Sequence, residues 1–143
     1  MQFDEILVPF DGSEGARHAA TTGSQLASQL GLPLKLAYVV PMTAESTMAL
    51  ASLTKEEVQA LHQNQADTVF STAQESLGQA IAGADRVVRI GDAATEILDY
   101  LADNPAALVI MGRRGLSPIK TLLMGSVSDK VMRHGGSAVM VVG

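Results

Sequence analysis

The sequence predicts an α/β fold in which a five-stranded parallel sheet is covered by helices on both faces. Short apolar segments alternate with helix-like segments along all 143 residues, the pattern of strand-helix-strand units joined by right-handed crossovers. Residues 106–111 are apolar throughout, as expected for a parallel strand covered on both faces. Hydrophobic residues make up 47% and charged residues 17% of the chain, so we expect one globular domain over residues 1–143.

The expected strands are short runs of apolar, mostly branched residues bounded by turn-forming residues. They cover residues 3–8, 34–40, 86–90, 106–111 and 137–142. The last of them is strongly apolar, and at a sheet edge it would be an aggregation hazard unless something covered it. We therefore expect a homodimer in which this strand pairs with its twin.

Four expected helices begin at capping residues and end at glycine or ahead of proline. They run from Ser13 to Gly31, from Thr54 to Gly83, from Asp92 to Asn104 and from Ser126 to Gly135. Helical spacing places Leu30, Leu61 and Met132 on the inward faces. Residues 41–53 have no clear period and fit a loop, with or without helical turns.

Composition excludes several classes of function. A net charge of −5 argues against general affinity for nucleic acid or an anionic membrane. No run approaches the roughly 20 apolar residues that cross a bilayer, and Asp4 and Glu5 stand where a signal sequence would become apolar. The chain has no cysteine, which fits a reducing compartment. We expect a soluble, cytoplasmic protein with no membrane insertion, and the three scattered histidines predict no structural metal site.

The candidate site is the glycine-rich stretch from Met111 to Ser128. Gly112 and Gly115 follow an apolar strand, and Gly125 stands before Ser126 and a new helix. Glycine lets backbone N–H groups approach an anion, and a helix N-terminus adds unpaired donors. Five of the ten basic residues fall between positions 113 and 133, which favours phosphate. From the residues alone, a plain turn with an ordinary N-cap and solvated cations remains an equal alternative.

Two standard nucleotide motifs are absent. No G-x-G-x-x-G follows the first strand, and residue 119 is Ile where a P-loop needs its second glycine. Ligands of open α/β sheets bind outside the carboxyl ends of the strands. If the first and fourth strands are neighbours, Asp11 and Gly112 flank one crevice there.

The glycine spacing, with Ile6-Leu7-Val8-Pro9-Phe10-Asp11-Gly12-Ser13 at the start and Ser137-Ala138-Val139-Met140-Val141-Val142 at the end, resembles the universal stress protein family over essentially the whole chain. The resemblance implies an open, Rossmann-like (adenine nucleotide alpha hydrolase-like) fold with strand order 3-2-1-4-5, and it also points to a homodimer. The three-glycine motif marks the nucleotide-binding branch of that family. The resemblance therefore implies binding of ATP, or of AMP or ADP, together with Mg²⁺, in a stress-response protein.

The resemblance also implies roles for individual residues. Gly112, Arg114 and Gly115 would follow the ribose and phosphates, and Gly125, Ser126, Val127 and Ser128 would hold the phosphates. Asp11 would lie near the ribose or a phosphate-bound Mg²⁺, Pro9 would shape the approach, Val39 would offer backbone groups to adenine, and Met111 would pack on the nucleoside. From the residues alone, Asp11 could instead cap the first helix, and Val39 and Met111 could be plain core.

No catalytic residue is identified, because Asp11 is the one plausible carboxylate and no Ser-His-Asp arrangement can be assembled. The leading expectation is an ATP-binding regulatory protein. The alternatives are a slow ATPase or nucleotide-transfer enzyme that uses the same pocket, and an ATP-sensing accessory regulator of a membrane transporter.

Overall fold

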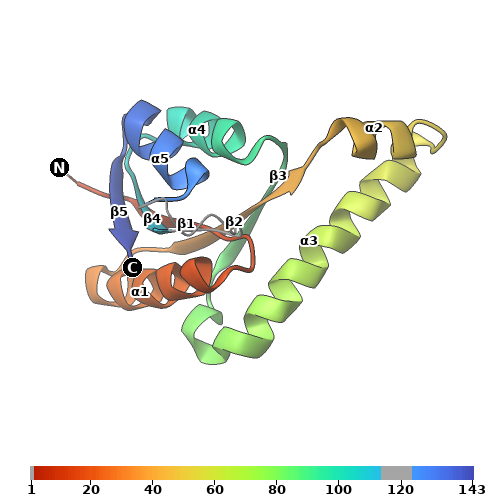
Figure 1. The fold of residues 1–143 in the computed structure, drawn as a ribbon. Coiled ribbons are helices and arrows are strands. Elements are labelled where there is room, and N and C mark those ends of the chain that lie inside the picture. The colour runs from red at the N-terminus through yellow and green to blue at the C-terminus, as the bar shows by residue number, and fades with distance from the viewer. Residues whose placement is uncertain (1, 114–123) are drawn as a thin grey trace.

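The computed structural model describes residues 2–113 and 124–143. Five parallel strands form one sheet in the order β3-β2-β1-β4-β5, which confirms the expected fold and strand order (Figure 1). The strands are β1 (Glu5–Pro9), β2 (Leu34–Pro41), β3 (Asp85–Gly91), β4 (Ala107–Gly112) and β5 (Ala138–Val142). Periodicity therefore located every strand, with small shifts at the ends.

Helices cover both faces of the sheet (Figure 1). They are α1 (Glu14–Leu30), α2 (Ala44–Leu50), α3 (Lys55–Leu77), the 3-10 helix η1 (Gly78–Ile81), α4 (Ala93–Asp103) and α5 (Ser126–His134). The prediction that the long helix runs to Gly83 is wrong. Gly78 has a φ of +50°, which favours glycine, and the α-helix ends one residue before it.

The core consists of two layers separated by the central strands. Ile6 and Val8 of β1 face α1 and α3, Leu7 faces α4 and α5, and all three are fully buried. Every residue of β4 is buried, as its uniformly apolar sequence predicted. Each large buried side chain contributes about 1.5–3 kcal/mol, so the central strands supply much of the stability.

Three side chains predicted to face inward are exposed instead. Leu30 is the last residue of α1, and Met132 follows the buried Val131, so a helical step of about 100° turns it outward. Leu61 immediately precedes the buried His62, so the same helical step turns it away from the sheet, and the N-terminal half of α3 also diverges from the sheet (Figure 1). No helix in the described ranges is long and apolar enough to cross a membrane.

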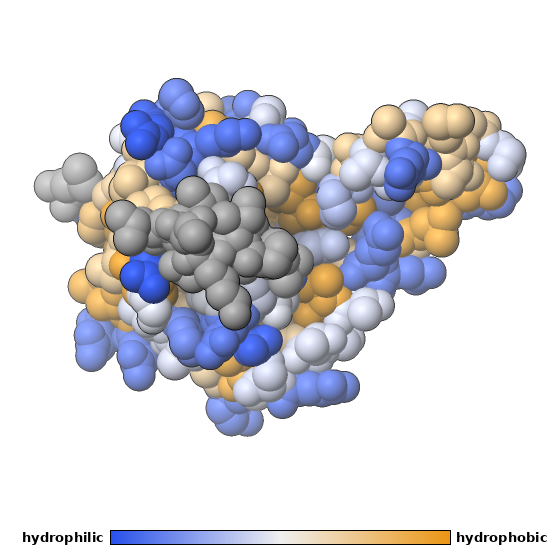
Figure 2. Space-filling model, viewed as in Figure 1, coloured by the Kyte–Doolittle hydropathy of each residue, from blue (hydrophilic) through white to orange (hydrophobic). Residues whose placement is uncertain are grey.

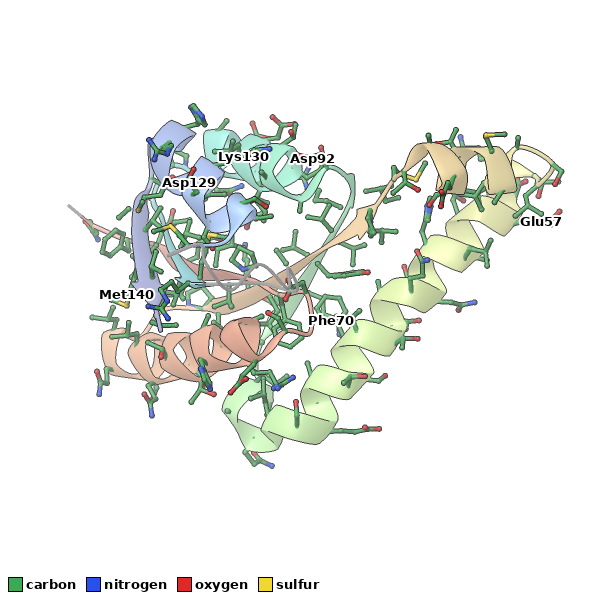
Figure 3. The ribbon with its side chains drawn as sticks, viewed as in Figure 1. Glu57, Phe70, Asp92, Asp129, Lys130 and Met140 are labelled. Carbon is green, nitrogen blue, oxygen red and sulfur yellow. The ribbon has the colours of Figure 1, made fainter. Side chains whose placement is uncertain are left out.

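Residues 42–77, which we call the arm, project from the body at the end of β2 (Figure 1). α2 buries no residue, so it settles the ambiguous stretch as helical but unpacked. α3 buries side chains only from His62 onward, at His62, Ala66, Phe70 and Ala73. The Phe70 ring meets Tyr38 of β2 edge-on at 6.5 Å and carries Arg86 at 4.9 Å on its face (Figure 3). The root of the arm is therefore packed on the sheet, and its tip is not.

Candidate functional site

A cavity of about 260 Å³ opens where β1, β2 and β4 end. Nine of the residues assigned to a site from the sequence line it: Pro9, Asp11, Val39, Met111, Gly112, Gly125, Ser126, Val127 and Ser128. The other lining residues are Phe10, Ser13, Ala16, Ala37, Tyr38, Ala93 and Ile97. Arg114 and Gly115, also assigned to the site, lie outside the described residues. The crevice expected between Asp11 and Gly112 is thus present at the carboxyl edge of the sheet.

The N-terminus of α5 opens on this cavity without a side-chain cap. The expected cap Ser126 is instead the first helical residue, and Gly125, which has no side chain, occupies the cap position. The Gly125 N–H donates to the Arg113 carbonyl at 2.6 Å, while the N–H groups of residues 126–128 have no helical acceptor. Their donors and the positive end of the helix dipole suit an anion.

Every other α-helix in the described ranges has a side-chain cap. The capping oxygens belong to Ser13 for α1, Thr43 for α2, Thr54 for α3 and Asp92 for α4. Each accepts a hydrogen bond from the third residue of its helix at about 3 Å. Among the described α-helices, α5 is therefore the one without a side-chain cap, and its first turn lines the cavity. The free backbone N–H groups there are left for a ligand.

Two contacts fix α5 and β4 against their neighbours. The buried Ser128 hydroxyl donates to the Gly112 carbonyl at 2.8 Å, so it holds α5 to β4 and leaves the backbone N–H of Ser128 as its group for a phosphate. A Cβ on Gly112 would lie only 2.5 Å from the Gly15 carbonyl carbon. Gly112 is therefore needed for the packing of β4 on α1, whatever the cavity binds.

Asp11 lies exposed at the mouth of the cavity. Its Oδ1 accepts the Ser13 N–H at 2.9 Å, and Ser13 rather than Asp11 caps α1. Among the described residues, no group of three or more histidines and acids could hold a metal ion. A single carboxylate still fits Mg²⁺, which usually takes one or two protein carboxylates and completes its octahedron with phosphate oxygens and water.

Tyr38 is a cavity residue that the sequence did not single out. Burial, and secondarily the charge of Asp11, raise the pKa of Tyr38 above its ordinary value, so its hydroxyl stays protonated at neutral pH. Strand alternation places it on the opposite face of β2 from Val39, toward Phe70. Its position next to Val39 at the end of the strand was the available signal, but the sequence prediction concerned only the backbone of Val39.

A second polar cluster lies at the opposite, amino edge of the sheet. The Tyr100 hydroxyl donates to Glu5 Oε1 at 2.7 Å, and Lys35 Nζ contacts Glu5 Oε2 at 2.7 Å. Hydrogen bonds from the ammonium to Glu5 and Tyr100 hold the pKa of Lys35 above its usual range. These buried or half-buried groups satisfy one another, so the cluster fastens α4 to β1 and β2.

Comparisons with known proteins agree with this architecture. The model of the universal stress protein family matches residues 2–143. Universal stress protein YxiE of Bacillus subtilis is 25% identical over 146 residues, which cover 98% of this chain and 99% of the relative. Universal stress protein UspA from Lactobacillus plantarum is 25% identical, with a TM-score of 0.78 over 100% of this chain and 99% of its own.

A further solved structure shares the fold at lower identity. It is the universal stress protein from Archaeoglobus fulgidus in complex with dAMP, 16% identical, with a TM-score of 0.68 and full coverage of both chains. The family match extends from the first strand to the last and includes every element that forms the cavity. This chain belongs to the universal stress protein family.

Proposed function

We propose that this chain binds an adenine nucleotide in the cavity at the carboxyl edge of the sheet. The observation that carries the proposal is the uncapped N-terminus of α5, whose first turn lines that cavity. Phosphates would accept from the N–H groups of residues 126–128, and the base would lie toward Val39 and Met111. The family relative solved with dAMP supports an adenine nucleotide as the ligand class.

ATP, rather than a monophosphate, is the nucleotide we favour. Five of the ten basic residues of the chain lie between positions 113 and 133, and although Arg133 is paired with Asp129, this local excess of positive charge favours a ligand with several phosphates. Asp11 stands at the cavity mouth, where it could share a Mg²⁺ with the outer phosphates. Mg²⁺ would neutralise phosphate charge, and Asp11 would fix its position.

We favour a regulatory role over catalysis. Among the described residues that line the cavity, Asp11 is the one carboxylate and there is no histidine, so in-line attack by water would lack a well-placed base. The same carboxylate is what a slow ATPase would use. Steady Mg²⁺-dependent phosphate release that is abolished by Asp11→Ala would favour the enzyme.

A homodimer through β5 is part of the proposal. β5 lies at one edge of the sheet, and its Met140 is exposed. Edge pairing with a second copy would cover this strand. Sedimentation over a range of concentrations should show a dimer, and a monomer at every concentration would contradict it.

The test of nucleotide binding removes one backbone donor without breaking the helix. Proline is favoured at the first helical position, and Gly125 already has the extended conformation (ψ 157°) that precedes a proline. Ser126→Pro should weaken ATP binding by about tenfold or more, the worth of a hydrogen bond to a charged group. Isothermal titration calorimetry with and without Mg²⁺ measures the change.

Two variants serve as controls. Ser126→Ala removes the hydroxyl and keeps the N–H, so its loss of affinity should be smaller. Lys55→Pro makes the same backbone change at the first residue of α3, on the arm, and should leave nucleotide affinity unchanged. Equal ATP affinity in wild type and Ser126→Pro would overturn the proposed site.

A further inference from the structure

Most of the exposed large apolar side chains in the described ranges lie on the arm or on the strand beside it. Of the eight large ones in the described ranges, three lie on the arm and two on the neighbouring edge strand β3. They are Met42, Met48 and Leu61, with Val88 and Ile90, and Met48 is 78% exposed. Figure 2 shows the hydrophobic colour over the arm, interrupted by hydrophilic residues. A contiguous apolar surface marks an interaction site, whereas single exposed apolar residues do not, so the residues that share one surface are the ones that matter.

A groove of about 480 Å³ runs between α3 and β3, and two of these residues, Val88 and Ile90, line it. Its walls are Gln59, Ala60, His62 and Gln63 of α3, and Val88 and Ile90 of β3. It exists because α3 leaves the sheet at a shallow angle, and because β3 is an edge strand with no neighbour on that side among the described elements (Figure 1). The groove therefore offers an apolar floor and amide side chains along one wall.

The arm is strongly acidic. Residues 42–77 contain five acids against the single base Lys55, for a net charge of −4. The acids are Glu45, Glu56, Glu57, Asp67 and Glu75, with Glu57 at the far end of the arm (Figure 3).

The nearest described cations offset only one of these charges, that of Asp67. Arg86 lies over the Phe70 ring and 3.8 Å from Asp67, at the root of the arm. Arg89 lies on the other face of β3, 5.7 Å from the Tyr100 ring centroid. The surroundings of the apolar residues are therefore negative.

Charge decides which partner fits this surface. Phosphates of nucleic acid and of anionic lipid would be repelled. The arm of a second copy carries the same −4 charge, so arm-to-arm contact is also disfavoured. A cationic partner with an apolar face would be attracted both by the negative charge and by the exposed apolar side chains. Flexible methionine side chains adapt to varied apolar surfaces.

We propose that the arm and β3 form a docking surface for a cationic amphipathic helix of another protein. Its apolar face would lie on Val88, Ile90 and Ala60, which line the groove, and its Lys and Arg side chains would face the carboxylates of the arm. This is helix-in-groove recognition, in which apolar anchors give affinity and flanking charge gives orientation. The surface is separate from the nucleotide cavity, so the proposal does not depend on the proposed function.

The test uses the whole chain and a designed helical peptide. The peptide has about 18 residues, or five turns, with leucine on one face and lysine on the other. Fluorescence anisotropy of the labelled peptide measures its affinity for the wild type and for the double variant Val88→Ser with Ile90→Ser, which changes the two large apolar residues that line the groove. Because both side chains are exposed, the double variant should fold normally and bind the peptide about tenfold more weakly or worse.

Three controls separate docking from general attraction between a basic peptide and an acidic protein. Leu30→Ser changes an apolar residue of similar exposure, 53%, on α1 and should leave the affinity unchanged. A peptide with glutamate in place of lysine should not bind, because its charge matches that of the arm. Sedimentation of the wild type and the double variant tests self-association through the groove.

The proposal is overturned by any of three results. The wild type does not bind the leucine-lysine peptide; the double variant binds it as tightly as the wild type; or the chain forms a dimer that the double variant loses. The last result would make a second copy the occupant of the groove.

Discussion

Polar groups are arranged in opposite ways at the two ends of the strands, which we call the amino edge and the carboxyl edge of the sheet. At the amino edge, Glu5, Lys35 and Tyr100 bond to one another. At the carboxyl edge, the first turn of α5 keeps its N–H groups free of side-chain caps and turns them toward a cavity. Paired groups hold a fold together, whereas unpaired donors are useful only when a ligand completes them. We therefore expect changes at the amino edge to alter stability, and changes at the carboxyl edge to alter binding.

The largest stability effect should come from Lys35→Met, which leaves the buried Glu5 carboxylate without its ion-pair partner. We expect a loss of about 3 kcal/mol, the lower end for a broken buried pair, because Lys35 is partly exposed. Urea denaturation measures it. Nucleotide affinity, measured at a temperature where the variant stays folded, should not change.

Two controls bracket this result. Adding Glu5→Leu to Lys35→Met should restore much of the stability, because no charge is then buried unpaired. Arg133→Met breaks an exposed pair with Asp129 and should cost less than about 0.5 kcal/mol. A loss as small for Lys35→Met as for Arg133→Met would show that the cluster is not a structural fastening.

Gly112→Ala tests whether a residue at the carboxyl edge affects stability as well as binding. The added Cβ would meet the Gly15 backbone, which cannot move aside as a side chain can, so we expect destabilisation by about 2 kcal/mol. Gly136→Ala is the matched control, since its Cβ would meet nothing within 4 Å. Chemical denaturation measures the stability of both variants. Equal stability of Gly112→Ala and Gly136→Ala would contradict the close contact between Gly112 and the Gly15 backbone.

Asp92→Ala should have the smallest effect, about 1 kcal/mol, the usual worth of an N-cap. Hydrogen bonds from Thr95 lower the pKa of Asp92 below its model-peptide value of 3.8. A carboxyl group with a lower pKa in the folded state stabilises the protein above the unfolded pKa, and loses that effect as pH falls through the folded value. The difference between wild type and variant should therefore be constant above about pH 5 and shrink at lower pH. A difference that grows on acidification would contradict this assignment.

Local sequence pattern predicted the strands, four of the five described α-helices and the glycine-rich stretch at the cavity, because each depends on periodicity or on glycine at a few neighbouring positions. The family resemblance, by contrast, assigned to the site Pro9, Val39, Met111 and Val127. Three features escaped it for physical reasons. Tyr100 and Glu5 are 95 residues apart, so no local pattern reveals their bond. The spacing of apolar residues put Leu61 on the inward stripe of α3, but the residue buried there is the histidine that follows it, so the pattern missed the helix face that lines the groove. Ser126 is a good capping residue, yet the chain caps α5 at Gly125, and only coordinates distinguish the two.

The strand order has a consequence for assembly. β5 and β3 lie at opposite edges of the sheet, and the arm stands beside β3. A dimer joined through β5 would therefore place its two docking grooves at the outer ends of one continuous sheet, facing away from each other. Such a particle would be bivalent, able to link two partner helices or to hold one two-headed partner with an avidity that a single groove could not supply.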